Sequence, residues 1–370
     1  MRELCIAVCT FLNVRVVAQS ERIITLHTDS VVRRYPHRAI SDTPSWSRSG
    51  ISDCSSTAQS GIVAIVPEHT PLVACFGEGL IALVPAVATP LENSRTFHRS
   101  LAGAEWNVAI ALSAAGVPAA VISRVGEDGF GRFLLSELAA HGVQIDGVES
   151  DAQASTGLYV KELVPDAVGS YASSMHYYRA SSAGSRISPE TLHTPAAERI
   201  LHEAQLVHTT GITPALSEGA RAAQNELFDN REHRLISFDL NWRPALWAGR
   251  EAEARVVLGD YMARADIAQC SEVDAQALFG TADAAALREM FGKPRYLIVT
   301  REDGSVAFDG AERVDAPALE TPVVETIGAG DAFAAGFIAG VLGGLSLSGS
   351  VARAHRMATR VLGSTRDHVD

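Results

Sequence analysis

The motif Gly328-Ala329-Gly330-Asp331 places an acid directly after a glycine turn, at the start of a helix of small residues. Gly328 and Gly330 let the backbone turn its N–H groups toward an anion, because no Cβ is in the way. The helix N-terminus adds partial positive charge, so we expect a phosphate there. Asp331 would repel that phosphate, which makes sense if it is a base that removes a hydroxyl proton as the oxygen attacks phosphorus. The alternative is that Asp331 only caps the helix.

Two other nucleotide-binding motifs are excluded by their context. The chain contains no Gly-x-x-x-x-Gly-Lys-Ser/Thr, so it has no P-loop. The stretch GEGLIA, residues 77–82, fits Gly-x-Gly-x-x-Ala loosely. It continues into a strand-like run that ends at a proline, whereas a dinucleotide fingerprint requires a helix there.

The composition excludes several classes of protein. The chain has 370 residues, 47% of them hydrophobic, which is enough for one large or two modest cores. Its net charge of −12 argues against a nucleic-acid partner, and it lacks the run of about eighteen apolar residues that a membrane span needs. The apolar start is interrupted by Asn13 and Arg15, so we do not expect a secretory signal. The five scattered cysteines predict neither disulfides nor a metal site, and favour a reducing cytoplasm.

The elements that must position the motif begin near residue 71. Residues 1–70 are rich in Ser, Arg and Thr without apolar periodicity, which predicts a disordered N-terminal extension. In residues 71–370, short apolar strands alternate with helices, which predicts an α/β fold with a mostly parallel sheet and helices on both faces. Residues 155–179 alternate residue by residue and contain turn formers, so we expect a small antiparallel β flap inserted there.

Two stretches resemble the signatures of the ribokinase-like (PfkB) carbohydrate kinases. ETIGAGDAF, residues 325–333, is similar to the family's C-terminal signature, with Glu325 where Asp is usual. Residues 101–143 resemble its N-terminal signature, with Gly-Ala-x-x-Asn-x-Ala and then Gly-x-Asp-x-x-Gly. The two stand in the family's order and spacing, and the resemblance covers residues 72–369. It implies a ribokinase-like fold, a kinase that uses ATP and Mg²⁺, and a homodimer formed through the flap.

Within the family, GLYVKE, YYRASSAGSRIS, FDLNWRPALW and TRDH are most similar to 2-keto-3-deoxygluconate kinases. This resemblance implies phosphorylation of the terminal hydroxyl of that sugar acid to give its 6-phosphate. A guanidinium such as that of Arg179 is a planar, bidentate partner for a carboxylate, which favours an acid sugar; a solvated surface arginine is the alternative. Two other functions stay open: a kinase for a neutral sugar such as fructose or for a nucleoside, and a sugar-binding sensor without catalysis.

The resemblance assigns roles residue by residue. Asp331 matches the catalytic base, and Gly328, Ala329 and Gly330 match the anion hole. The residues that match sugar contacts are Gly103, Ala104, Glu105, Asn107, Tyr159, Tyr177, Tyr178, Arg179, Asn241, Arg243 and Asp367. Those on the nucleotide side are Asp239, Thr300, Gly304 and His355, together with Gly328 and Gly330. Asn107 has the alternative of a helix N-cap, and Asp367 that of a polar tail.

Two stretches on the nucleotide side depart from the family pattern. SEVD, residues 271–274, replaces an Asn-x-x-Glu that helps to organise magnesium and phosphate, and either Asp274 or Glu272 can supply the carboxylate. TREDG, residues 300–304, is one residue shorter than the usual Thr-x-Gly-x-x-Gly and lacks its first glycine. Because substrate phosphates hold much of the magnesium, ATP is not excluded, but the metal ligand and the nucleotide preference stay open.

Overall fold

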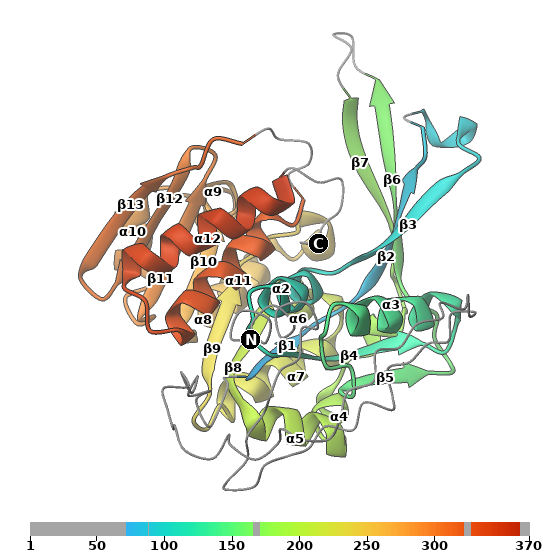
Figure 1. The fold of residues 1–370 in the computed structure, drawn as a ribbon, viewed down its shortest axis with the longest axis horizontal. Helices are drawn as coiled ribbons and strands as arrows, with labels where there is room; N and C mark the ends of the chain where they lie inside the picture. Colours follow the sequence, from blue (N-terminus) through green and yellow to red (C-terminus); the bar gives the residue numbers. More distant parts are fainter. Residues whose placement is uncertain (1–71, 88, 166–170, 322–326, 363–370) are drawn as a thin grey trace, which may run out of the picture. The chain divides into compact units, whose positions relative to one another are not determined.

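The computed structural model describes residues 72–87, 89–165, 171–321 and 327–362. They form two β-sheets and the helices that cover the larger one (Figure 1). The extension predicted for residues 1–70 lies outside the described residues, as do Glu325 and Asp367. Among the helices that are described, none has both the length and the apolar character that crossing a membrane requires.

The larger sheet has nine strands in the order β13-β12-β11-β10-β9-β8-β1-β4-β5. Every neighbouring pair from β11 to β5 is parallel, and β12 and β13 continue the sheet antiparallel. The mostly parallel sheet is therefore confirmed, whereas its antiparallel edge was not predicted. The strands are β1 (Leu72–Phe76), β4 (Ala119–Gly126), β5 (Val148–Asp151), β8 (Ala204–Thr210), β9 (Leu235–Asp239), β10 (Ile267–Ser271), β11 (Tyr296–Arg301), β12 (Gly304–Asp309) and β13 (Glu312–Pro317).

Helices cover both faces of this sheet, and each face has its own apolar core, as the alternating pattern predicts. One face packs against α2 (Ala104–Ala114), α3 (Gly129–Ala140), α11 (Ala329–Leu342) and α12 (Leu347–Leu362). The other packs against α4 (Pro189–Leu192), α5 (Pro195–Glu203), α6 (Thr213–Leu216), α7 (Glu218–Asp229), α8 (Glu251–Arg264), α9 (Glu272–Phe279) and α10 (Ala284–Met290). Short 3-10 turns lie at Leu91–Asn93, Gly184–Arg186 and Pro244–Trp247.

The small residues of α11 allow α12 to pack closely against it. A Cβ atom on Gly336 would lie 2.7 Å from the Cα of Ala354, and one on Gly340 would lie 2.7 Å from the Cα of Ser350. Both separations are shorter than a carbon–carbon contact, so neither glycine can carry a side chain unless the helices move apart. This packing fixes the position of α11, and with it the Gly-Ala-Gly-Asp motif at its N-terminus.

The smaller sheet is the flap, which projects from the body (Figure 1). Its four strands have the order β3-β2-β6-β7, with β2 (Leu80–Pro85), β3 (Phe97–Ala102), β6 (Leu158–Pro165) and β7 (Tyr171–Tyr178). The pairs β2–β3 and β6–β7 are antiparallel, and β2–β6 is parallel. The hairpin predicted at residues 155–179 corresponds to β6 and β7, but β2 and β3 also belong to the flap and were not assigned to it.

Candidate active site

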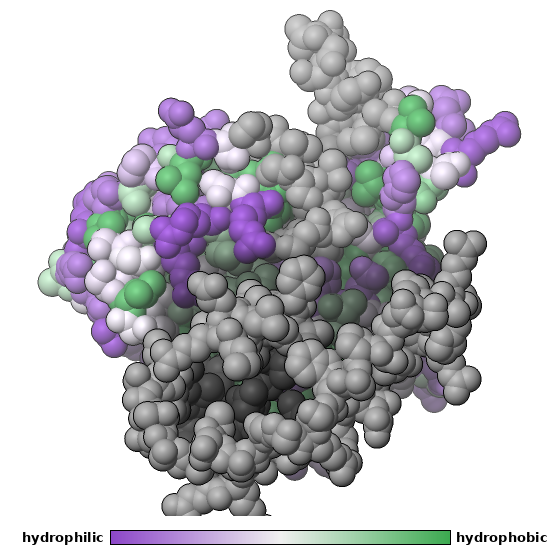
Figure 2. All heavy atoms as spheres, viewed as in Figure 1, coloured by the Kyte–Doolittle hydropathy of each residue, from purple (hydrophilic) through white to green (hydrophobic). Residues whose placement is uncertain are grey.

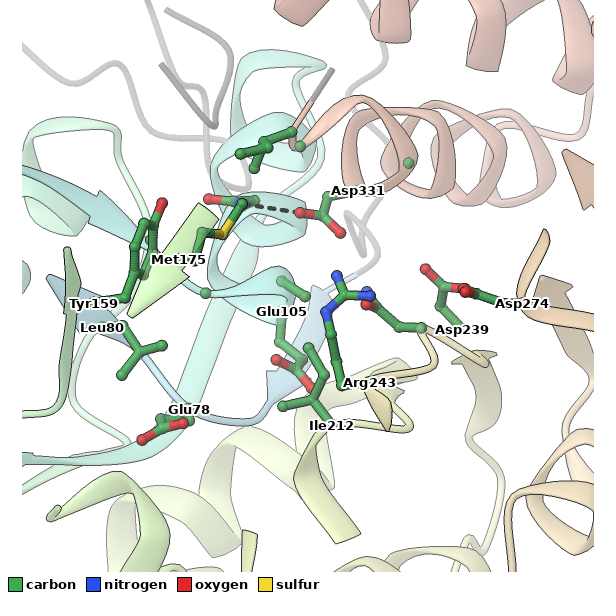
Figure 3. A pocket seen from close by; sticks show the side chains of 18 of the residues that line it. Glu78, Leu80, Glu105, Tyr159, Met175, Ile212, Asp239, Arg243, Asp274 and Asp331 are labelled. Carbon is green, nitrogen blue, oxygen red and sulfur yellow. Dashed lines mark hydrogen bonds between the residues drawn. The ribbon is translucent and has the colours of Figure 1, made fainter. Parts of the chain in front are cut away.

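A cavity of about 540 Å³ opens where the carboxyl ends of the central strands face the base of the flap (Figure 3). In parallel α/β sheets this is the place where ligands bind, because loops leave the strands there. Its lining carries five acids and two arginines: Glu78, Glu105, Asp239, Asp274, Asp331, Arg179 and Arg243. The cavity is therefore strongly charged.

The N-termini of α2 and α11 meet at this cavity. Their N-cap residues are Gly103 and Gly328, whose φ angles of 136° and 80° favour glycine, and neither helix has a side-chain cap. Asn107, in the first turn of α2, donates from Nδ2 to Oδ2 of Asp331 in the first turn of α11 at 2.8 Å (Figure 3). Two positive helix ends thus point at one site, which suits an anionic ligand.

Asn107 is not the N-cap of α2, because Gly103 occupies that position; the capping alternative for Asn107 is therefore wrong. Its Oδ1 atom is buried and has no hydrogen-bond partner in the structure. Buried polar atoms are nearly always paired in native proteins. The side chain thus holds Asp331 through one end of its amide and offers an acceptor to a ligand hydroxyl at the other.

Three carboxylates crowd the part of the cavity formed by the ends of β9 and β10. Burial, followed by the negative charges of Asp331 and Asp274, raises the pKa of Asp239 well above its usual range, while Arg243 opposes the shift. Burial also raises the pKa of Asp274, whose Oδ2 accepts a hydrogen bond from the backbone N–H of Trp242 at 3.2 Å. An additional cation would relieve this repulsion.

The flap supplies an aromatic and cationic wall. Tyr159 on β6 is buried and faces Tyr177 on β7, with their ring centroids 5.4 Å apart. The guanidinium of Arg179 lies 5.4 Å from the Tyr177 ring centroid. Tyr178, predicted to bind with them, is 64% exposed and does not line the cavity, because successive side chains of a strand point to opposite faces.

Residues 70–367 match the model of the family described as pfkB family carbohydrate kinase. The chain belongs to the pfkB family of carbohydrate kinases. It is thus an ATP-dependent sugar kinase, and the cavity at the ends of its strands is the candidate active site.

Relatives of this pfkB kinase are named for different sugars. The 2-dehydro-3-deoxygluconokinase of Thermoproteus tenax is 34% identical over 276 residues, which cover 73% of this chain and 82% of the relative. Fructokinase-1 of Oryza sativa subsp. japonica is 32% identical over 272 residues, 72% of this chain and 81% of the relative. The crystal structure of the uncharacterized sugar kinase PH1459 from Pyrococcus horikoshii in complex with ATP has a TM-score of 0.70 and 27% identity, and the match covers 80% of this chain and 93% of that one.

Arg179 of the kinase is not a surface residue, since its side chain is 11% exposed. Its Nη2 donates to Oε2 of Glu78, an acid that sequence analysis did not select. Ser182 donates from Oγ to Oε1 of the same carboxylate at 2.9 Å. In the sequence, the only sign that Glu78 belongs to the site was its position between two glycines at a strand end. That stretch had been considered only as a dinucleotide motif.

Glu105, predicted to contact the sugar, lines the cavity, but its carboxylate is hydrogen-bonded to other side chains of the protein. Its Oε1 accepts hydrogen bonds from the hydroxyls of Thr210 at 2.7 Å and Thr213 at 2.9 Å. Burial raises its pKa despite these bonds. Glu105 thus ties the start of α2 to the end of β8 and to α6, and positions the cavity wall there.

The structure brings most of the predicted residues together at this cavity. Those that line it are Gly103, Ala104, Glu105, Asn107, Tyr159, Tyr177, Arg179, Asp239, Asn241, Arg243, Thr300, Gly328, Gly330 and Asp331. Ala329 lies within the motif but is not part of the lining, and Asp367 lies outside the described residues.

Two residues predicted on the nucleotide side do not line the cavity. Gly304 has a φ of 154°, and a Cβ there would lie 2.1 Å from the carbonyl oxygen of Ala316, so the β12–β13 pair requires glycine. The Nε2 atom of His355 pairs with the Ser305 hydroxyl at 2.9 Å, and burial lowers the pKa of its ring. Both residues therefore support the fold outside the cavity lining.

Sequence analysis also missed Gln269, which lies in the middle of β10. Its Nε2 donates to the backbone carbonyl of Gly330 at 3.3 Å. This bond fastens the glycine turn to the sheet. A glutamine within an apolar strand was the only sign of this contact in the sequence.

Proposed function

We propose that this kinase transfers the terminal phosphoryl group of ATP to the terminal hydroxyl of 2-keto-3-deoxygluconate, giving the 6-phosphate. The observation that carries the proposal is the bond between Asn107 and Asp331, which joins two helix N-termini at one cavity. One site thus contains backbone N–H groups that can bind an anion, the Asp331 carboxylate, and an Asn107 oxygen that can accept a hydrogen bond from a sugar hydroxyl. Phosphoryl transfer needs little more from a protein than such positioning and charge stabilisation.

In this mechanism, Asp331 accepts the proton of the attacking hydroxyl. Asn107 holds the Asp331 carboxylate in place through its amide. The N–H groups of the turn at Gly328 and Gly330 face the charge that grows on the transferred group, as an oxyanion hole does. The flap wall, which includes Tyr159, excludes water that would otherwise accept the phosphoryl group.

Magnesium is the cation that would bind in the part of the cavity formed by the ends of β9 and β10. Asp239 and Asp274 are the carboxylates suited to this role, because Mg²⁺ prefers oxygen ligands and is usually held by one or two carboxylates plus substrate phosphates. Within the described ranges, no group of three or more acids, histidines or cysteines is arranged to hold a metal ion by itself. Bound there, Mg²⁺ would neutralise charge on the phosphates.

An acid sugar is favoured by the two arginines in the cavity and by the relative named 2-dehydro-3-deoxygluconokinase. Arg179 and Arg243 approach the site from the flap and from the segment after β9. A neutral sugar such as fructose is the second candidate, because Glu78 already neutralises Arg179 and a fructokinase is similarly related. The two candidate substrates differ in whether they carry a carboxylate. The test is therefore whether the kinase prefers the sugar that carries one.

We also propose a homodimer formed through the flap. Its strands β3 and β7 are sheet edges, which natural proteins usually cover. Hydrophobic residues lie among hydrophilic ones on the part of the flap formed by β2 and β3 (Figure 2). Val87 and Phe97, at the far end of these strands, are 69% and 37% exposed.

The experiment that tests the substrate is a panel of sugars and sugar acids with ATP and Mg²⁺, measured by ADP release. We expect the highest kcat/KM with 2-keto-3-deoxygluconate and at least tenfold less with fructose and ribose. ADP release with fructose but not with the sugar acid would overturn the proposal in favour of the second candidate. The same panel without added Mg²⁺ and with a chelator should show no turnover.

A further inference from the structure

Glu78 lies in the corner between β1 and β2, where the body meets the flap. The body-side ends of the other three flap strands surround it. A Cβ on Gly103, after β3, would lie 2.5 Å from the backbone oxygen of Glu78, and one on Gly184, after β7, would lie 2.3 Å from its Cγ. A Cβ on Gly157, just before β6, would lie 3.2 Å from its Oε1. Gly157 and Gly184 therefore make room for the Glu78 side chain, and Gly103 makes room for its backbone.

Both oxygens of the Glu78 carboxylate are engaged. Arg179 donates to Oε2 and Ser182 donates to Oε1, while Glu78 itself is 2% exposed. Neither contact serves the transfer of a phosphoryl group directly. The pair nevertheless determines how much positive charge Arg179 presents to the cavity that both residues line.

The hydrogen-bonding capacity of Arg179 is only partly used. A guanidinium has five N–H donors in a fixed fork. In the structure Nη2 donates a hydrogen bond to Glu78, and the buried Nε has no hydrogen-bond partner. Arg179 therefore has N–H donors left for a ligand. Its positive charge, however, is already balanced by Glu78, which takes the place of a ligand carboxylate.

We propose that Glu78 sets the preference of the sugar site between acid and neutral sugars by holding Arg179 in a neutral ion pair. This inference rests on the proposed function. The carboxylate of a sugar acid must compete with Glu78 for the guanidinium, whereas a neutral sugar meets no such competition. Glu78 is thus a positioning residue that limits the affinity of the site for acids.

The variant Glu78→Gln tests this directly. The amide can keep both contacts, because its oxygen accepts from Arg179 and its nitrogen donates to the Ser182 hydroxyl, while the negative charge is removed. We expect the Kd for 2-keto-3-deoxygluconate, measured by calorimetry without ATP, to fall about tenfold, and the Kd for fructose to stay within twofold. An unchanged ratio of the two Kd values, or weaker acid binding, would overturn the proposal.

The matched control is Glu162→Gln. Glu162 lies on β6 of the same flap, its carboxylate pairs with His176 at 2.7 Å, and it does not line the cavity. The substitution removes one negative charge from the flap but outside the cavity lining, so both Kd values should stay within twofold of wild type. A gain in acid binding equal to that of Glu78→Gln would show that net charge alone is responsible, and would contradict a specific role for Glu78.

A second pair of variants separates the ion pair from packing. Burial raises the pKa of Glu78, and the charge of Arg179 opposes that shift. In Arg179→Gln the opposing charge is gone, which raises the pKa of Glu78 further, and Glu78 has no guanidinium left to neutralise. Adding Glu78→Gln to this variant should therefore leave the acid-to-fructose ratio of Kd values within twofold. The double variant holds no unpaired buried charge, so it should fold even if Glu78→Gln alone does not. A several-fold change between these two variants would mean that Glu78 acts independently of Arg179.

The two proposals fail in different ways. If the proposed function is wrong, the wild-type kinase releases no ADP with 2-keto-3-deoxygluconate. If only the role of Glu78 is wrong, the wild type is active on the acid, and the ratio of Kd values does not respond to Glu78→Gln. The conservative variant Glu78→Asp, which keeps the charge, should retain the wild-type ratio.

Discussion

At the scale of single residues, the proposed chemistry depends on a charged Asp331 held beside an anion-binding turn. We expect Asp331→Asn to lower kcat by about 10²–10⁴-fold, the usual contribution of a positioned base. The KM for the sugar should change little, because an asparagine keeps the size and can still accept a hydrogen bond from Asn107. Kinetics from coupled ADP release provide the measurement.

The matched control for this variant is Asp303→Asn, whose carboxylate is 81% exposed and pairs with Arg301 outside the cavity. It should leave kcat within twofold of wild type. If Asp331→Asn retains near-normal turnover, Asp331 is not the base and the proposed mechanism is wrong.

Asp239 connects activity with stability. Since burial and neighbouring acids raise its pKa in the folded state, the folded protein keeps a proton on Asp239 over a pH range in which the unfolded chain has released it. Its unfavourable charge is absent below the unfolded pKa of about 3.9 and develops as the pH rises through the folded pKa. We expect Asp239→Asn to raise the free energy of unfolding near pH 7 by about 1 kcal/mol, the order of magnitude that a pKa difference of one unit represents, and the gain to vanish toward low pH.

Urea unfolding at several pH values measures this effect. We expect the same variant to lose turnover, because Asp239 lines the cavity and is one of the two carboxylates proposed to hold Mg²⁺. If Asp239→Asn instead lowers the free energy of unfolding at neutral pH, the charged Asp239 carboxylate is more favourably solvated in the folded protein than its burial among acids implies.

At the scale of elements, the packing of α11 on α12 positions the motif. Gly340→Ala places a Cβ 2.7 Å from the Cα of Ser350, and backbone cannot yield as a flexible side chain does. We expect a loss of about 1–3 kcal/mol in the free energy of unfolding, the usual cost of overpacking a core. Chemical denaturation monitored by circular dichroism measures it.

The control is Gly259→Ala in α8, where the nearest atom to the new Cβ is 3.6 Å away. Alanine there should stabilise the protein by about 0.5–1 kcal/mol, because it removes the entropic cost of glycine in a helix. The two variants therefore have opposite expected signs. Equal effects would show that the close approach of α11 and α12 is not what requires Gly340.

The sequence predicted the parallel body well because the alternation of apolar strands and helices is a local pattern. The flap was predicted only in part. Its β6–β7 pair is a hairpin of neighbouring segments, whereas β2 pairs with β6 across more than seventy residues of sequence. Only three residues separate β1 from β2, yet the two strands join different sheets. A pattern within β2 shows that it is a strand, but not which sheet it joins.

The candidate site, too, was predicted where a local sequence pattern was sufficient. Asp331 and Asn107 were found because each lies in a recognisable signature, and the structure then brings the two signatures into contact. Glu78 and Gln269 were missed because their partners, Arg179 and Gly330, are distant in sequence. Tyr178 lies outside the cavity lining because adjacent residues of a strand share a motif but not a face.

At the scale of the whole molecule, the flap edge predicts how two copies associate. Val87 and Phe97 lie together at the far end of β2 and β3, since the N–H of Ala86 donates to the carbonyl of Thr96 between them. Apolar side chains beside an unpaired edge strand favour contact with a second flap. We expect wild type to be a dimer at about 20 µM by light scattering, and Phe97→Glu to be a monomer, because two buried charges would face each other across the two-fold axis.

The matched variant is His98→Glu, which adds a charge on the next residue of β3, where the side chain points to the other face of the sheet. If the interface uses the face that carries Phe97, His98→Glu stays dimeric. A wild-type monomer, or equal dissociation by both variants, would contradict this interface. Because neither residue lines the cavity, retained kcat in the Phe97→Glu monomer would further show that one chain completes its own active site, whereas lost kcat would mean that the flap needs its partner to cover the sugar.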